Sequence, residues 1–326
     1  GVVDLAVGAP GDDDNGDDRG AVWILFMDDD GRVDQRRKIS DDTGIFPGGL
    51  DDNDGFGAAL ASIGDLNRDG VFDIAVGAPQ DDDDGDNRGA VWILFLDSVG
   101  SVQGLQKIST LAGNFLGALS DNDHFGSAVA ALGDLDGDNI GDLAVGAPED
   151  SDGGTGKGAV WILFMNNDGS VKSQQKISAE RGGFEGNLDS NDRFGSALAG
   201  IGDLDANGVN DLAVGASGDD DGGTDRGAVW ILFLNADGTV DTEQKISHSE
   251  GKFNGDLGDG DAFGSALADI GDLDGDGITD LAVGAPGSDD GGTDRGALWL
   301  LFPDASGELR SELKISATAG NFDTDL

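Results

Sequence analysis

The chain has 326 residues, 37% of them apolar, so it is long enough to bury a core of its own. Its formal net charge is −46, with 65 acidic against 19 basic residues, which argues against nucleic acid or an anionic membrane as a partner and favours cations. Cysteine is absent, which excludes disulfides and thiolate chemistry, and the longest apolar runs fall far short of the roughly 20 residues of a membrane helix.

Tryptophan recurs every 69 residues, each time inside the sequence AVWILF or its variant ALWLLF. One repeating unit therefore accounts for the whole chain, and we expect a single domain over residues 1–326. The repeats run over about 1–55, 56–124, 125–193, 194–262 and 263–326. The first repeat is partial, because Gly1 aligns with Gly70 and the segment of the first strand lies before that point.

The expected elements follow one order in every full repeat. A strand of small residues, FGSALA at 194–199, leads through a nine-residue acidic loop to a second strand, DLAVGA at 211–216. A second acidic loop leads to AVWILF at 228–233, and the fourth strand ends in QKIS before a long connector. Short apolar pieces rich in Val, Ile and Phe and bounded by Gly, Asp or Pro predict strands, and no helical period is sustained.

The third strand is apolar on both faces and must be covered on both, whereas the small residues of the first strand suit a crowded position. A repeated four-stranded sheet of this kind is typical of a propeller blade. We therefore predict an all-β fold, a β-propeller of four-stranded antiparallel blades in which the first repeat lacks its inner strand. A solenoid is the alternative, although 69 residues is long for one solenoid turn. The sequence leaves open a closed five-blade ring or a slice of a larger propeller or array.

The first acidic loop occupies residues 65–73, 134–142, 203–211 and 272–280. Side-chain oxygens fall at loop positions 1, 3, 5 and 9 in all four copies, and a Ca²⁺ ion takes six to eight such oxygen ligands. Position 7 is apolar and can offer its backbone carbonyl, and Gly or Asn at position 6 permits a sharp bend. An EF-hand is excluded because position 12 is apolar and a strand follows. We expect one Ca²⁺ per complete loop, four in all, in preference to Mg²⁺.

The second acidic loop, GDDDGGTDRG at 218–227, has a looser register between copies. It could hold another cation, but a solvated turn is the favoured interpretation, since runs of like charge usually face water. The basic residue before the third strand could pair with these carboxylates; it is Arg19, Arg88, Lys157, Arg226 or Arg295.

The connector carries a recurring phenylalanine and leucine that we expect to anchor it to the blade, and its final DND is interpreted as a turn. The phenylalanines are Phe46, Phe115, Phe184, Phe253 and Phe322, and the leucines are Leu50, Leu119, Leu188, Leu257 and Leu326.

The segments FGSAL, DLDGDG and DLAVGAP, in this order, resemble the FG-GAP repeat, the blade of integrin α-subunit propellers. The resemblance covers essentially the whole chain, and it implies a calcium loop between strands one and two of each blade, with partners bound at the opposite face. The implied ligands are Asp65, Asn67, Asp69, Val71 and Asp73; Asp134, Asp136, Asp138, Ile140 and Asp142; Asp203, Asp205, Asn207, Val209 and Asp211; and Asp272, Asp274, Asp276, Ile278 and Asp280. Asp4 would be the last ligand of a partial site. Integrin propellers differ in having seven blades of less uniform length.

An enzyme is not expected, because the two histidines, His124 and His248, occupy different repeat positions and no insertion breaks the repeat. The leading hypothesis is a calcium-binding extracellular or cell-surface propeller that acts in adhesion or assembly through protein contacts. Calcium loops of extracellular modules bind at about 10⁻⁴ to 10⁻³ M, which matches concentrations outside cells.

Two alternatives remain open. One is a lectin-like propeller with a glycan partner, although each tryptophan lies in a doubly buried strand that favours a core role. The other is a structural subunit of a surface filament or coat, which could self-assemble when a neighbouring chain supplies the missing strand. The sequence identifies no specific ligand and no oligomeric state.

Overall fold

The computed structural model describes residues 3–41, 46 and 49–320, and all regular elements in these ranges are β-strands. The chain divides into two compact units. The first comprises Gly1–Asp134, Asp138–Val145 and Leu163–Gln174, and the second comprises Leu135–Gly137, Gly146–Ile162 and Gln175–Leu326. Within the described ranges, no helix offers the length and apolar character that a membrane crossing requires.

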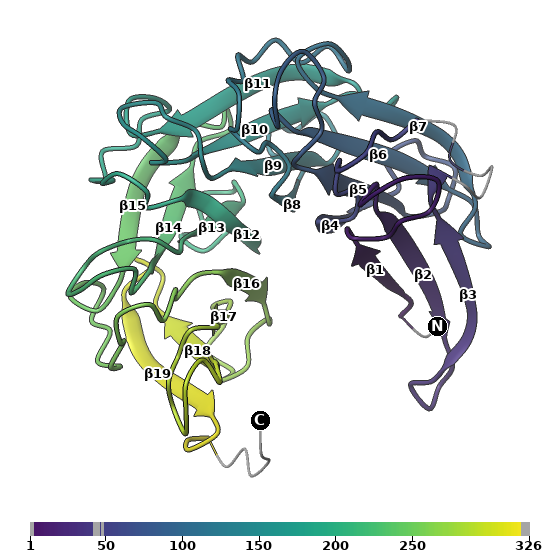
Figure 1. Ribbon diagram of the computed structural model, residues 1–326. Helices are drawn as coiled ribbons and strands as arrows, with labels where there is room; N and C mark the ends of the chain where they lie inside the picture. Colours follow the sequence, from purple (N-terminus) through teal and green to yellow (C-terminus); the bar gives the residue numbers. More distant parts are fainter. Residues whose placement is uncertain (1–2, 42–45, 47–48, 321–326) are drawn as a thin grey trace. The chain divides into compact units, whose positions relative to one another are not determined.

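The first unit contains two complete sheets, which Figure 1 shows in purple and blue. The first repeat forms a three-stranded antiparallel sheet of β1 (Leu5–Ala9), β2 (Ala21–Met27) and β3 (Val33–Ile39). The second repeat forms a four-stranded sheet of β4 (Ala59–Gly64), β5 (Asp73–Ala78), β6 (Ala90–Leu96) and β7 (Val102–Ile108). The strand predicted to be missing from the first repeat accounts for the difference.

The second unit also contains two complete four-stranded sheets. One is built from β12 (Phe194–Gly202), β13 (Asp211–Ala216), β14 (Ala228–Leu234) and β15 (Val240–Ile246). The other is built from β16 (Ala266–Asp269), β17 (Leu281–Ala285), β18 (Ala297–Pro303) and β19 (Leu309–Ser316). The boundary between the units passes through the third repeat, whose strands are β8 (Ala128–Gly133), β9 (Asp142–Ala147), β10 (Ala159–Met165) and β11 (Val171–Ser178). The predicted fold class, all-β with four-stranded antiparallel propeller blades, is confirmed.

Strand register is the same in successive blades. In β13, β14 and β15, Val214 pairs with Trp230, and Trp230 pairs in turn with Lys245. In the second repeat, Val76 pairs with Trp92, and Trp92 pairs in turn with Lys107. Paired residues of neighbouring strands lie on one face of a sheet, so each tryptophan lies beside the lysine of QKIS.

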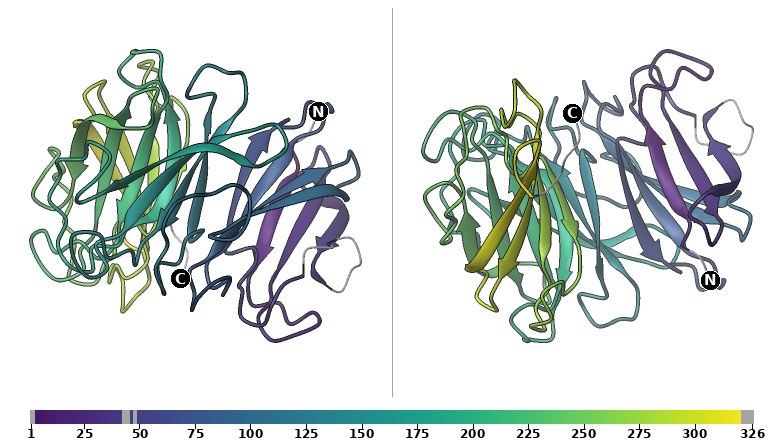
Figure 2. Two further views of the ribbon diagram at one scale, coloured as in Figure 1. Left: turned by 90° about the horizontal axis from the view of Figure 1, so that it is seen from above. Right: turned by 90° about the horizontal axis from the view of Figure 1, so that it is seen from below.

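Neighbouring blades cover one another's faces, and Figure 2 shows the sheets of the second unit packed in this way. One apolar cluster joins Val229, Ile231 and Phe233 of β14 to Val283 and Trp299 of the last blade. A corresponding cluster joins the first two repeats. All seven residues of β14 are buried, as the doubly apolar pattern predicts.

The glycines of the Phe-Gly and Gly-Ala segments lie where two blades meet. A Cβ atom on Gly215 would meet the backbone carbonyl of Gly264, and one on Gly77 would meet that of Gly126. The Phe-Gly of one repeat therefore contacts the Gly-Ala of the preceding repeat, and only glycine leaves room for the backbones to approach so closely.

The connector is anchored by its apolar residues, as predicted. The rings of Phe184 and Phe194 have their centroids 5.0 Å apart, and Phe184 also meets Trp230 edge-on at 4.9 Å. The phenylalanines and leucines of the four described connectors are all at most 7% exposed. Phe322 and Leu326 lie outside the described residues.

Candidate metal centre

The first acidic loop is curled around the carboxylate at its first position. Asp203 accepts backbone hydrogen bonds from Asn207 at 2.8 Å and from Gly208 at 2.9 Å, one on each oxygen. Asp65, Asp134 and Asp272 accept the same pair of bonds in the other copies. The side chain at position 1 therefore fixes the backbone at positions 5 and 6, which brings alternate side chains to one side of the loop.

Two backbone positions of the loop adopt the left-handed conformation. Position 6 does so as predicted, with φ of 91° at Gly208 and 64° at Asn139. Position 4 does so as well, and here the residue is not always glycine: Arg68 has φ of 65° and Ala206 of 62°. The sequence analysis missed position 4, although glycine stands there in the other two copies and was the available signal.

The carboxylate at position 9 is buried and joins the loop to the blade. Asp211 accepts hydrogen bonds from the backbone N–H of Leu204 at 2.8 Å and of Leu234, at the end of β14, at 3.0 Å. Burial raises the pKa of Asp211 to about 6, against the opposing effect of these two bonds. Asp4 accepts a 2.9 Å bond from Met27 in the same way, which places it at position 9 of a partial loop.

The last copy departs from this pattern for a clear reason. Pro303 stands where Leu234 donates its N–H in the preceding repeat, and proline has no N–H to donate. Asp280, which is fully buried, therefore has one side-chain oxygen without a hydrogen-bond partner. Such an orphaned buried oxygen is costly unless a further group satisfies it.

The predicted oxygens converge in the second unit. Three carboxylate oxygens lie within 4.8 Å of one another in the set Asp203, Asp205 and Asp211, and again in the set Asp272, Asp274 and Asp276. In the loop at 134–142, Asp136 belongs to the second unit and the other predicted ligands to the first. In the loop at 65–73, Asn67 supplies an amide where other copies have a carboxylate.

This donor set fits a hard divalent cation. All of its side-chain donors are carboxylate or amide oxygens, which Ca²⁺ prefers, and nitrogen or sulfur ligands are absent from the predicted positions. Carboxylates held this close repel one another, and a cation between them removes that cost. The backbone carbonyls of position 7 stay a prediction.

Comparison with known proteins identifies the repeat. The family model for the FG-GAP repeat matches residues 56–94, 125–163, 194–232 and 263–301, each match running from the Phe-Gly through the acidic loop into the tryptophan strand. This is an FG-GAP repeat protein.

Similar proteins are integrin alpha subunits. The chain is 34% identical over 204 residues to integrin alpha-PS5 of Drosophila melanogaster, covering 62% of this chain and 18% of that protein. It is 37% identical over 166 residues to integrin alpha-6 of Gallus gallus, covering 50% and 14%, and 37% identical over 168 residues to integrin alpha-2 of Mus musculus, covering 50% and 13%. The FG-GAP chain thus spans less than a fifth of the length of these relatives.

The second acidic loop of the FG-GAP repeat is exposed at Asp220 and Asp225, as expected for a solvated turn, but its Asp219 and Asp221 pair with a lysine. The ammonium of Lys245, on β15, lies 2.6 Å from a carboxylate oxygen of Asp219 and 2.8 Å from one of Asp221. Lys245 is 8% exposed and Asp219 is 2% exposed, so this ion pair is buried, whereas Asp221 is partly exposed. Other repeats form equivalent clusters: Lys38 with Asp12 and Asp14, Lys107 with Asp81 and Asp83, Lys176 with Asp150 and Asp152, and Lys314 with Asp290.

The same lysine covers the tryptophan of the FG-GAP blade. The ammonium of Lys245 lies 5.4 Å from the centroid of Trp230, within reach of a cation–π interaction. Trp230 is 4% exposed, so it is a core residue, as the sequence predicts. The signal for this arrangement was present in the fixed spacing of tryptophan and the lysine of KIS in every repeat, and it was not used.

The basic residue before the third strand pairs mainly with the connector. Arg226 lies 2.9 Å from Asp259, and Arg88 contacts Asp121 of the connector as well as Asp84 of the second loop. The predicted pairing within the second loop is therefore confirmed for Arg88, and the connector partners are new.

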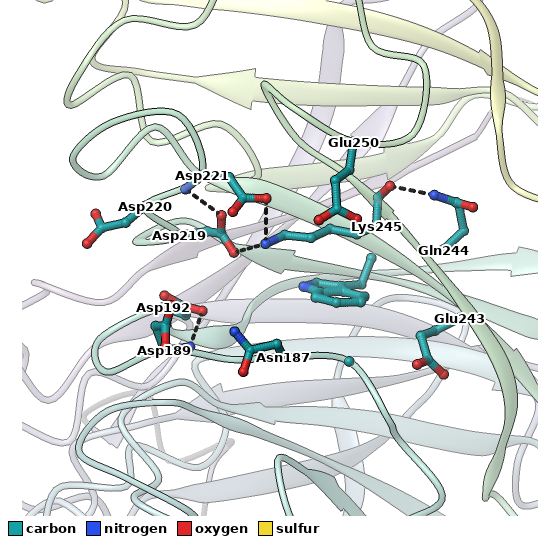
Figure 3. A pocket seen from close by; sticks show the side chains of 12 residues that line it. Asn187, Asp189, Asp192, Asp219, Asp220, Asp221, Glu243, Gln244, Lys245 and Glu250 are labelled. Carbon is teal, nitrogen blue, oxygen red and sulfur yellow. Dashed lines mark hydrogen bonds and ion pairs between the residues drawn. The ribbon is translucent and has the colours of Figure 1, made fainter.

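A cavity of roughly 410 Å³ opens beside the Lys245 cluster and is lined by Asn187, Asp189 and Asp192 of the connector (Figure 3). Asp192 is 2% exposed; one of its oxygens accepts the backbone N–H of Asp189 at 2.7 Å, which confirms the predicted turn, and the other has no hydrogen-bond partner. Burial raises the pKa of Asp192 to about 7, and the nearby Asp219 carboxylate adds to the effect.

The substitution Asp192→Asn is expected to stabilise the FG-GAP protein at pH 8 and not at pH 4. The folded state keeps the Asp192 proton up to about pH 7, whereas the unfolded chain loses it near pH 4, so wild-type stability falls as the pH rises between these values. The variant has no such proton, and its free energy of unfolding at pH 8 should exceed that of the wild type by about 1 to 3 kcal/mol. Urea denaturation at both pH values measures the difference.

Asp54→Asn is the matched variant in the first unit, because burial also raises the pKa of Asp54 to about 7. An equal effect of Asp192→Asn at pH 4 and pH 8 would contradict the assignment of the titrating group.

Proposed function

We propose that this chain is a calcium-binding β-propeller domain, residues 1–326, that acts outside the cell or on its surface in adhesion or assembly through contacts with other proteins. The observation that carries the proposal is the convergence of carboxylate oxygens within 4.8 Å in the first acidic loop. The similarity to integrin alpha subunits supports the cell-surface setting.

Four complete loops would hold Ca²⁺, through the side chains at positions 1, 3, 5 and 9 and the carbonyl at position 7. Bound Ca²⁺ would supply positive charge that cancels the repulsion between these carboxylates. Residues of the chain itself shape the loop. The carboxylate at position 1 fixes the bend, and the buried carboxylate at position 9 bonds the loop to the end of the third strand. The turn between the first two strands of each blade is thereby held rigid, which keeps the loops of the propeller in fixed positions for a partner.

The geometry favours a protein partner over a glycan. Lectin pockets present an aromatic face for a sugar to stack on, but Trp230 has Lys245 over its ring and Phe184 at its edge. Catalysis has little support among the described residues, because the convergent carboxylates are explained by a metal and the histidines stand at unrelated repeat positions.

Attachment of intact cells to the immobilised chain tests the adhesive role. We expect attachment in 1 mM calcium and its loss in excess chelator, with no inhibition by a panel of free monosaccharides and disaccharides. Asp205→Ala, which removes one ligand of a calcium loop, should weaken attachment, whereas Asp220→Ala in the exposed part of the second loop should not. Attachment that is insensitive to chelator, or is abolished by a sugar, would overturn the proposed role.

A further inference from the structure

The fourth strand of each repeat carries, at its second position, a residue whose charge varies between blades. The residues are Gln103 in β7, Lys172 in β11, Asp241 in β15 and Arg310 in β19. The tryptophan strands, in contrast, are nearly constant from one repeat to the next.

Where this residue is basic, it reaches the first acidic loop. The ammonium of Lys172 lies 2.6 Å from a carboxylate oxygen of Asp138, at position 5 of its loop. The guanidinium of Arg310 contacts Asp276, at position 5 of the last loop, and lies 3.3 Å from Asp274 at position 3. Both basic groups thus occupy carboxylates that the cation would also use.

The basic residues follow the charge of the loops. The loops at 134–142 and 272–280 have aspartate at all four side-chain positions, and these are the two loops that face Lys172 and Arg310. The loop at 65–73 has Asn67 at position 3, and its repeat carries Gln103 at the equivalent strand position. The loop at 203–211 has Asn207 at position 5, and its repeat carries Asp241 there. A basic residue is therefore present where the loop carries one more carboxylate and is missing where it does not.

We propose that Lys172 and Arg310 act as internal counter-cations that compete with Ca²⁺ for the carboxylate at position 5 and so lower the calcium affinity of their loops. The inference rests on the calcium binding proposed above. A cation entering either loop must break a charge-assisted hydrogen bond at position 5 and meet the positive charge of Lys172 or Arg310, whereas Gln103 and Asp241 bring no positive charge to their loops. The same basic groups stabilise their loops when calcium is scarce.

The test compares calcium titrations of the wild type and of the double variant Lys172→Gln/Arg310→Gln, by calorimetry at low ionic strength. We expect the sites at 134–142 and 272–280 to tighten roughly 3- to 10-fold in the variant, while the other two sites keep their affinity. The reverse substitution, Gln103→Lys, should weaken the site at 65–73 by a similar factor. In excess chelator, the double variant should melt at a lower temperature than the wild type, since its loops have lost their counter-ions.

The possible failures are distinguishable. Identical calcium isotherms for the wild type and the double variant would overturn the counter-cation role and leave calcium binding intact. Calcium binding by the double variant alone would support the role, because the basic groups would then block the sites. Absence of binding in both chains would overturn the proposed function together with this inference.

Discussion

Lys245→Met is expected to lower the free energy of unfolding by about 3 to 5 kcal/mol, measured by urea denaturation. The substitution keeps the length of the side chain and its packing over Trp230, but it leaves Asp219 and Asp221 facing each other without a cation. Asp219 is 2% exposed and would be left as a buried charge without a cationic partner, which accounts for the loss.

The chain provides a matched control in its last repeat. Ser288 replaces the buried aspartate there, so Lys314 pairs with the carboxylate of Asp290 and its side chain is 17% exposed. Lys314→Met should therefore cost much less, on the order of 1 kcal/mol. Adding Asp219→Ser to Lys245→Met reproduces the composition of the Lys314→Met variant and should recover part of the loss. Equal losses for the two single variants would contradict a buried, doubly paired lysine.

Calcium is expected to stabilise the chain by about 2 to 6 kcal/mol at 1 mM free ion. A site with a dissociation constant of about 10⁻⁴ to 10⁻³ M contributes roughly 0.4 to 1.4 kcal/mol at that concentration, and four such sites sum to this range. Thermal unfolding in 1 mM calcium and in excess chelator should thus give clearly separated melting temperatures. The metal-free loops keep their carboxylates close together, and this repulsion is what the ion relieves.

Variants of single loops measure how much of the calcium-dependent stabilisation each loop contributes. Asp205→Ala removes a ligand from one loop and should lose about a quarter of the calcium-dependent stabilisation, since four loops share it. Asp220→Ala, an exposed residue of the second acidic loop, should retain all of it. A melting temperature that is the same with calcium and with chelator in the wild type would contradict the proposal.

The strands and the first acidic loop were predictable because the same residue types recur at the same positions of each repeat. Tryptophan at a spacing of 69 residues fixes the alignment of the copies, and the oxygens at loop positions 1, 3, 5 and 9 stay in register through all four. Asp203 then curls the loop through local hydrogen bonds that span only four and five residues. Such local chemistry can be derived from the sequence without knowledge of strand pairing.

The buried ion pairs could not be derived in the same way. Lys245 meets Asp219 only because the pairing of β13 with β14 and of β14 with β15 places them on one face, and the two residues stand 26 positions apart in the chain. A run of aspartates alone predicts a solvated turn, since charge patterns carry no information about which residue folds back over them. The unpartnered oxygen of Asp280 likewise depends on Pro303, at the far end of another strand.

Calorimetric titration of the chelator-stripped chain with calcium tests the central claim most directly. The proposed function predicts about four calcium ions bound per chain, one for each complete loop, with dissociation constants of about 10⁻⁴ to 10⁻³ M and little competition from magnesium at equal concentration. A titration that shows no saturable calcium binding, or binding that magnesium displaces equally well, would contradict it.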